Sequence, residues 1–343
     1  MSTFPVSDHC DGERFFNRYQ PADRSLAEVA RWMLTRQATP WPDRASVVSH
    51  EPPPVHVDPG RLAITFIGHS TFLIRTASTA ILTDPVFTSH AGPFGLIGPR
   101  RVRPPAIAPD ALPPIDLVLV SHNHYDHLQP SSLQLFRERA ACVVPLGLRA
   151  LLPPAGDLPP EGGSYERDSR SHERDPVASG FSRKIHELDW WQQKAAGATA
   201  ITCVPAQHFS ARTPWDRDRT LWCGFVVQID GITLYFAGDT GYSPHFAEIG
   251  ARFSSIDAAL LPIGAYEPRW FMKPAHMNPE EAVRAHQDLH ARVSIGMHFG
   301  TFNLTDEGID EPVQALDRAR TAAGVSPNAF RVLDFGESLI AGT

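Results

Sequence analysis

Short apolar runs separated by turn residues predict β-strands along most of the chain. Between residues 60 and 122 the runs LAITFIG, TFLIRT, TAILTD and DLVLVSH alternate with Gly, Ser and Asp, which are typical turn residues. Similar runs follow after residue 198: TAITCVPA, LWCGFVVQI, ITLYFAG and DAALLPIG. We therefore expect an α/β protein with a two-layered core of sheets and helices outside.

Two segments have the sequence features of helices. The first, SLAEVARWMLTR (25–36), ends before the proline-rich stretch TPWPD. The second, NPEEAVRAHQDLH (278–290), opens with an Asn cap followed by acidic residues. We expect residues 1–60 to form an N-terminal arm that packs on one domain, residues 61–343. A stretch of about 157–182, rich in Gly, Ser and charge, predicts a mobile surface loop inserted in that domain.

Composition narrows the classes of protein. With 343 residues, 42% of them hydrophobic, the chain can bury a substantial core. Its net charge of -7 argues against a nucleic-acid partner, which selects for clustered Lys and Arg. The absence of a signal-like start and of a long apolar run favours a cytoplasmic protein. The four cysteines have no C-x-x-C spacing, so we expect free thiols.

The octapeptide SHNHYDHL (121–128) predicts a metal site directly behind an apolar strand. His122 and His124 stand two residues apart, so in an extended segment they project to the same side, as two ligands of one ion would. Asp126 and His127 follow in the turn, where they can face a second ion about 3.5 to 4 Å away. The spacing therefore predicts two metals.

Two polar residues at other strand ends are candidates for supporting roles. Asp84 in LTDP can accept a hydrogen bond from a ligand imidazole and fix its tautomer, although Asp-Pro is also a common turn. His69 in GHST is a similar candidate.

The H-x-H-x-D-H pattern after a strand resembles the metallo-β-lactamase superfamily. The resemblance implies an αββα sandwich, in which two mixed sheets are flanked by helices. It also implies three further ligands: His208 in PAQHFSART, Asp239 in AGDTGY as a bridge between both metals, and His298 in SIGMHFGTF. One metal would then have three imidazoles and Asp239 beside it, and the other would have Asp126, His127 and His298.

From about residue 60 onward the chain also resembles the N-acyl phosphatidylethanolamine-hydrolysing phospholipase D family. The motifs GHSTFLI, LTDPVF, SHNHYDHL, ELDWW, AGDTGY, PIGAYEPRWFM and NPEEAV occur in that family's order. The polar stretch near 157–182 and the N-terminal arm depart from it. The resemblance implies that His276 contacts substrate, with Tyr266 and Arg269 beside the site and Arg269 as an anion contact. It leaves a homodimer and peripheral membrane contact open.

Ligand types indicate the chemistry. Imidazole and carboxylate without thiolate suit Zn²⁺ best, while Mn²⁺ and Fe²⁺ stay open. Two cations lower the pKa of a bridging water from about 15.7 towards about 7, which makes hydroxide available to attack a phosphodiester. Asp126, Asp239 and His276 are the residues that we expect to take part in catalysis, with Asp126 relaying a proton to the leaving group.

Other residues near these motifs have two interpretations each. Arg100, Arg101 and Arg103 in GPRRVRPP either attract a phosphate headgroup or belong to a solvated basic loop. The aromatic residues in ELDWW and PRWFM either line a cleft for acyl chains or belong to the core: Trp190, Trp191, Trp270 and Phe271.

Competing functions share the same ligands. A lactonase or esterase resembling the L-ascorbate-6-phosphate lactonases would direct the hydroxide at a carbonyl carbon. A nuclease of the superfamily would need an RNA-gripping arm or an inserted domain between Asp239 and His298, and a β-lactamase would carry an export signal; the sequence has neither feature. A metal-dependent binding protein without catalysis is the alternative outside the enzymes. We expect a hydrolase acting on a small-molecule or phospholipid substrate.

Overall fold

The computed structural model describes residues 3–152, 185–197 and 199–342, and within them the strands form two mixed sheets of seven strands each. The first sheet has the order β14-β1-β2-β3-β4-β5-β6. It is antiparallel from β14 to β3 and parallel from β3 to β6. Its strands are β1 (Arg61–Gly68), β2 (Thr71–Arg75), β3 (Ala80–Thr83), β4 (Leu117–Leu119), β5 (Ala141–Pro145), β6 (Ile185–Leu188) and β14 (Ser338–Gly342).

The second sheet repeats this plan with the order β13-β12-β11-β10-β9-β8-β7. It is antiparallel from β7 to β10 and parallel from β10 to β13. Its strands are β7 (Gln193–Ala196), β8 (Thr199–Val204), β9 (Gly224–Ile229), β10 (Ile232–Phe236), β11 (Ile256–Pro262), β12 (Ala291–Met297) and β13 (Phe330–Arg331).

The main core lies between the two sheets. It contains Phe66 and Ile64 from β1 together with Phe225 from β9, all fully buried. Alternation along β4 shows how the first sheet is covered on both faces: Leu117 joins this core, whereas Val118 faces a second cluster on the other side. Burial of both faces accounts for the continuous apolar runs in the sequence.

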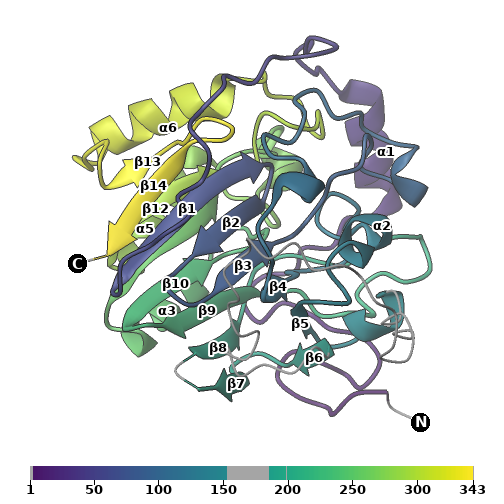
Figure 1. Cartoon of the computed structure of the whole chain (residues 1–343). Helices are drawn as coiled ribbons and strands as arrows, with labels where there is room; N and C mark the ends of the chain where they lie inside the picture. The colour runs from purple at the N-terminus through teal and green to yellow at the C-terminus, as the bar shows by residue number, and fades with distance from the viewer. Residues whose placement is uncertain (1–2, 153–184, 198, 343) are drawn as a thin grey trace, which may run out of the picture.

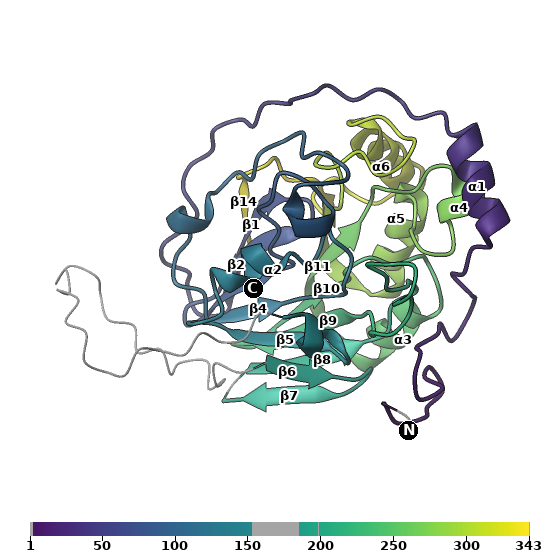
Figure 2. The ribbon, with the colours of Figure 1, turned by 90° about the vertical axis from the view of Figure 1, so that its right-hand side faces the viewer.

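Helices cover the outer faces. On the second sheet, α5 (Pro279–Asp288) packs against β11, β12, α3 (His245–Arg252) and α6 (Glu311–Ala322), and Figure 2 shows these helices on one flank. On the first sheet, α2 (Pro130–Gln134) contributes Leu133 to the second cluster. The helix α1 (Leu26–Thr35) begins at the cap Ser25 and lies on the outside of the molecule next to the short α4 (Arg269–Met272) (Figures 1 and 2).

Most of the expected elements are present. The helices predicted over 25–36 and 278–290 are α1 and α5, and each predicted apolar run overlaps one of the strands above. The four cysteines are free and buried, as predicted. The predicted loop at 157–182 lies outside the described residues. Among those that are described, no helix combines the length and the apolar character needed to cross a membrane.

The N-terminal residues contribute to the main core. Cys10 and Phe15 are both 2% exposed and belong to the cluster between the sheets. The division of the chain at residue 60 stays a prediction, but these two side chains of the arm are buried with the sheets.

Candidate metal centre

The candidate ligands gather at one edge of the sandwich because each follows the end of a strand. His69 follows β1, the segment 122–127 follows β4, and His208 follows β8. Asp239 follows β10 and His298 follows β12. The pairing makes β1 and β4 run in one direction in the first sheet, and β8, β10 and β12 run in one direction in the second, so the carboxyl ends of each set share one sheet edge. Packing of the two sheets then brings residues such as His69 and His298 together, with ring centroids 4.1 Å apart.

Three histidines form the first group, which we call the nitrogen half: His122, His124 and His208. Nε2 of His122 lies 2.9 Å from Nδ1 of His124, and Nε2 of His208 lies 3.2 Å from the same atom. Ligands of one tetrahedral Zn²⁺ at about 2.0 to 2.1 Å would be separated by about 3.3 Å. These three nitrogens therefore face one point.

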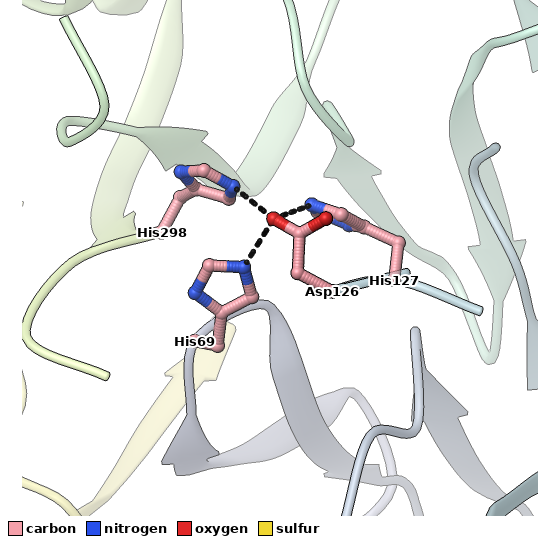
Figure 3. A group of neighbouring side chains, drawn as sticks. All are labelled: His69, Asp126, His127 and His298. Atoms are coloured by element: carbon pink, nitrogen blue, oxygen red, sulfur yellow. Dashed lines mark hydrogen bonds and ion pairs between the residues drawn. The ribbon is translucent and has the colours of Figure 1, made fainter. Parts of the chain in front are cut away.

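The second group, the carboxylate half, surrounds Asp126 (Figure 3). Its Oδ2 atom lies 3.1 Å from Nε2 of His69, 3.3 Å from Nε2 of His298 and 3.6 Å from Nε2 of His127. All three rings point towards the carboxylate from different elements. His69, predicted as a supporting residue, thus lies as close to Asp126 as the predicted ligands do.

Asp239 joins the two halves. Its Oδ2 atom lies 3.2 Å from Nε2 of His127 and 3.0 Å from Nε2 of His298, on the carboxylate side. The same oxygen lies 3.9 Å from Nε2 of His208, on the nitrogen side. Asp239 thus lies between the two groups, and its role as a bridge stays a prediction.

Several atoms at the centre have no hydrogen-bond partner among the described residues. They are buried and face the site: Asp239 Oδ1, His127 Nε2, His298 Nε2 and His276 Nδ1. Buried polar atoms are normally paired, because an unmet donor or acceptor loses its water without replacement. At this centre, imidazole nitrogens lie about 3 Å from carboxylate oxygens but do not have the geometry of hydrogen bonds. Ligands of a common cation would be arranged in this way, so these residues fit divalent metals.

Asp84 fixes the ring orientation of two of these histidines. Its carboxylate accepts hydrogen bonds from Nδ1 of His127 at 2.6 Å and from the Ser121 hydroxyl at 2.6 Å. Since that hydroxyl donates to Asp84, it accepts from Nδ1 of His122, 2.9 Å away. In both histidines Nε2 is then the ring atom that faces the site, as an orienting carboxylate would place it, and the supporting role of Asp84 stays a prediction.

Two further contacts fix this arrangement. His208 donates from Nδ1 to the Ala275 carbonyl at 2.9 Å, so its Nε2 also faces the centre without a proton. Gly238 precedes Asp239 with φ +60°, and a Cβ atom there would lie 2.6 Å from Cβ of Ser121. A side chain at residue 238 would therefore push the Asp239 turn away from the His122 segment.

Burial and charge divide the histidines into two kinds. Burial lowers the pKa of His122 and His208 well below the usual value and that of His124 to about 4, so the nitrogen half is neutral. Burial also disfavours charge on His298, but Asp239 and Asp126 raise its pKa to about 9. The pKa of His127 is raised well above its usual range by the same carboxylates, against the effect of burial.

Known proteins share this architecture. A family model described as the beta-lactamase superfamily domain matches residues 79–299. The chain belongs to the beta-lactamase superfamily. Both the resemblance and the fold predicted from the sequence are thereby confirmed.

Three relatives show where in the superfamily the chain lies. An uncharacterized protein of Mycobacterium tuberculosis is 38% identical over 86% of this chain and 73% of its own. An N-acyl-phosphatidylethanolamine-hydrolyzing phospholipase D of Caenorhabditis elegans is 35% identical over 82% of this chain and 76% of its own. A mitochondrial protein of that name from Saccharomyces cerevisiae is 32% identical over 78% of this chain and 53% of its own.

Solved structures agree with the superfamily fold. A metallo hydrolase from Ignicoccus hospitalis has a TM-score of 0.55 at 22% identity, covering 82% of this chain and 98% of that one. An isothiocyanate hydrolase from Delia radicum gut bacteria has a TM-score of 0.57 at 18% identity, covering 81% of this chain and 98% of that one. At these identities the likeness concerns the fold.

His276, Tyr266 and Arg269 lie on the segment that flanks the superfamily centre. Nδ1 of His276 lies 4.0 Å from Oδ2 of Asp239, and its ring centroid is 5.0 Å from that of His208. Arg269 pairs with Glu281 at 2.7 Å and donates to the His276 carbonyl at 2.9 Å. Tyr266 is buried beneath the segment. In this arrangement Arg269 supports His276 through the backbone, and its guanidinium is already paired.

The arginines and aromatic residues of uncertain role mostly have structural contacts. Arg101 donates to the carbonyls of Val86 and Thr88, so it belongs neither to a solvated loop nor to a free headgroup site. Trp190 is buried and donates to the Trp222 carbonyl, which makes it a core residue.

Proposed function

We propose that this chain, a metal-dependent hydrolase of the beta-lactamase superfamily, is a binuclear phosphodiesterase of phospholipase D type, which cleaves N-acyl phosphatidylethanolamine or a related phosphodiester. The observation that carries this proposal is the position of Asp239 between two groups of ligands, 3.0 Å from His298 on one side and 3.9 Å from His208 on the other. The named phospholipase D relatives support the choice of substrate class.

Two divalent cations would be held by the two halves, with Asp239 shared. The nitrogen half supplies His122, His124 and His208, and the carboxylate half supplies Asp126, His127 and His298, beside which His69 lies. Imidazole and carboxylate donors without thiolate favour Zn²⁺ over Mn²⁺ or Fe²⁺. When bound, the cations supply hydroxide at neutral pH and neutralise the phosphoryl oxygens.

The side chains have separate tasks. His276 is neutral, since burial lowers its pKa to about 4, and its unpaired Nδ1 is placed to contact a phosphoryl oxygen when it carries the proton. Burial raises the pKa of Asp126, but the nearby rings of His127, His298 and His69 bring it well below the usual value. As an ionised acceptor, Asp126 can take a proton first and pass it to the leaving oxygen.

A membrane-bound substrate would require contact with a lipid surface. Three large apolar side chains of α1 are exposed, Leu26 at 88%, Met33 at 69% and Leu34 at 86%, which supports peripheral membrane contact. The cytoplasmic location and the homodimer stay predictions.

The test is product formation from N-acyl phosphatidylethanolamine in mixed micelles, using protein whose metal content has been measured. We expect phosphatidic acid and N-acylethanolamine, lost on chelation and restored by metal. Intact lipid with both metals bound would reject the phospholipase assignment. A lactone and a small phosphodiester assayed in parallel would then decide between a lactonase, whose nucleophile attacks carbon, and another phosphodiesterase.

A further inference from the structure

The first residues of the chain form a strap on the outside of the sandwich, which we define as residues 9–24. Figure 2 shows this N-terminal segment following the outer edge of the molecule up to α1. Cys10 and Phe15 anchor it in the main core, and the Phe15 N–H donates to the Asp218 carbonyl at 2.8 Å. The strap is thus fixed independently of any contact with the metal centre.

The start of the strap is also held by charge and by an aromatic ring. His9 stacks on Trp190 with ring centroids 4.4 Å apart. Its Nε2 atom lies 2.7 Å from Asp189, and its Nδ1 atom lies 2.7 Å from Asp8. Both ring nitrogens are therefore paired with carboxylates.

From this anchored position, Asn17 reaches a residue of the centre. Its Nδ2 donates to the His208 carbonyl at 2.7 Å, and its Oδ1 accepts from the His208 N–H at 3.1 Å. One side-chain amide thus pairs with both backbone groups of one residue, 191 positions away. Two bonds to the same residue fix the direction of its Cα–Cβ bond and therefore the place of the imidazole.

The residue before His208 extends the same connection. Gln207 is 1% exposed, and its Nε2 donates to the carbonyl of Gln20 at 2.6 Å and to that of Pro274 at 3.1 Å. Arg24, at the end of the strap, donates from Nε to the Phe271 carbonyl at 2.8 Å. The strap therefore holds the two loops that carry His208 and His276.

We propose that Asn17 is a positioning residue of the metal centre, which sets the backbone of His208 so that its Nε2 lies beside Nδ1 of His124 and Nε2 of His122. The inference rests on the proposed binuclear centre. Side chains that orient metal ligands typically change metal affinity by about 10- to 100-fold when removed. Because Asn17 reaches only His208 among the ligands, the loss should be confined to the nitrogen half.

The experiment titrates metal-free protein with buffered Co²⁺ and records the visible absorption of each bound ion. For Asn17→Ala we expect one of two Co²⁺ ions to bind about 10- to 100-fold more weakly, with an altered spectrum, and the other to bind as in the original protein. Asn17→Asp keeps the acceptor for the His208 N–H but sets a carboxylate oxygen against the His208 carbonyl in place of the donor, so it should also weaken binding of that ion and alter its spectrum.

The matched control is Asp11→Ala. Asp11 accepts hydrogen bonds from the backbone of Glu13 and Arg14 within the strap and contacts no ligand. We expect unchanged Co²⁺ binding. An equal loss in this control would assign the effect to strap docking in general and overturn the role of Asn17.

The outcomes separate the two proposals. If the original protein binds fewer than two Co²⁺ ions, the binuclear centre fails. If it binds two and Asn17→Ala gives the same affinities and spectra, only the role of Asn17 fails. Should Asn17→Ala not fold, Asn17→Asp decides by the same measurement, with unaltered binding again rejecting the role.

Discussion

The two halves of the metal centre use the same residue type in opposite electrostatic states. In the nitrogen half, burial has the largest effect on the imidazole pKa values. It lowers them and keeps His122, His124 and His208 neutral. In the carboxylate half, Asp126 and Asp239 raise the pKa of His298 to about 9 against the same burial. The difference teaches that the carboxylates, which attract a cation, also attract protons that compete with it.

Asp239→Asn should have the largest effect, because Asp239 lies beside the ligands of both halves. We expect hydrolysis to fall to background and bound metal to fall, measured by product assay and metal analysis. Cys142→Ser is the control, since Cys142 lies in the cluster on the outer face of the first sheet and should leave chemistry intact. Full activity in Asp239→Asn would reject the two-metal assignment.

His124→Ala should affect only the nitrogen half, whereas Asp239→Asn should affect both halves. Nδ1 of His124 is the atom nearest to both partners in the nitrogen half. We expect turnover to be abolished with about one metal ion lost per chain, counted after dialysis against buffered metal. Loss of both ions would show that the halves do not bind independently.

The pH dependence of metal binding should differ between the halves. An imidazolium cannot bind metal, so a ligand with a raised pKa binds better as pH rises towards that pKa. With the pKa of His298 at about 9, its neutral fraction rises about 50-fold from pH 7 to pH 9, and the pKa of His127 is raised as well, so affinity in the carboxylate half should rise by at least about 50-fold. The nitrogen half, with His124 at about 4, should be unchanged over that range. Buffered metal titrations at both pH values measure the two affinities. An equal change with pH in the affinities of both ions would contradict the prediction.

Asp84→Asn should weaken the hydrogen bonds that orient a ligand histidine in each half. Asp84 accepts from Nδ1 of His127 in one half and, through Ser121, orients His122 in the other. We expect about 10- to 100-fold weaker metal binding or activity. Because both halves depend on this carboxylate, both ions should be affected, unlike in His124→Ala; wild-type affinities would reject the orienting role.

The smallest effect concerns the strap, whose only ligand contact is with the nitrogen half. Burial lowers the pKa of His9, but Asp189 and Asp8 raise it above the usual value overall. Its contribution to stability is therefore complete below the unfolded pKa of about 6.5 and is lost as pH rises through the higher folded value.

His9→Gln tests that sign. The substitution should reduce the free energy of unfolding by about 2 kcal/mol at pH 6 and by less at pH 9, since hydrogen bonds to charged groups contribute about 1.5 to 3 kcal/mol. Urea denaturation at both pH values measures the difference. A loss that grew with pH would show that His9 is neutral in its contacts.

The sequence predicted what local spacing determines. Strand and turn geometry determine where the side chains of His122, His124, Asp126 and His127 point. The apolar runs identified most of the strands. It did not predict the strand β14, which pairs with β1 from the other end of the chain. Nor did it identify Ser121, whose hydroxyl links Asp84 to His122, because a serine before a histidine carries no distinguishing signal. Asn17 meets His208 only through tertiary packing, so no local pattern could reveal it.

The distribution of the ligands between the sheets has a consequence for how the protein is made. Each half takes residues from the first sheet and one from the second, His208 or His298. A chain still emerging from the ribosome lacks the last ligand until residue 298 has been synthesised and folded. A nascent or truncated chain that ends before residue 208 can therefore present the H-x-H-x-D-H segment without completing either half, and one that ends before residue 298 lacks a residue of the carboxylate half. The complete centre forms only when both sheets have come together.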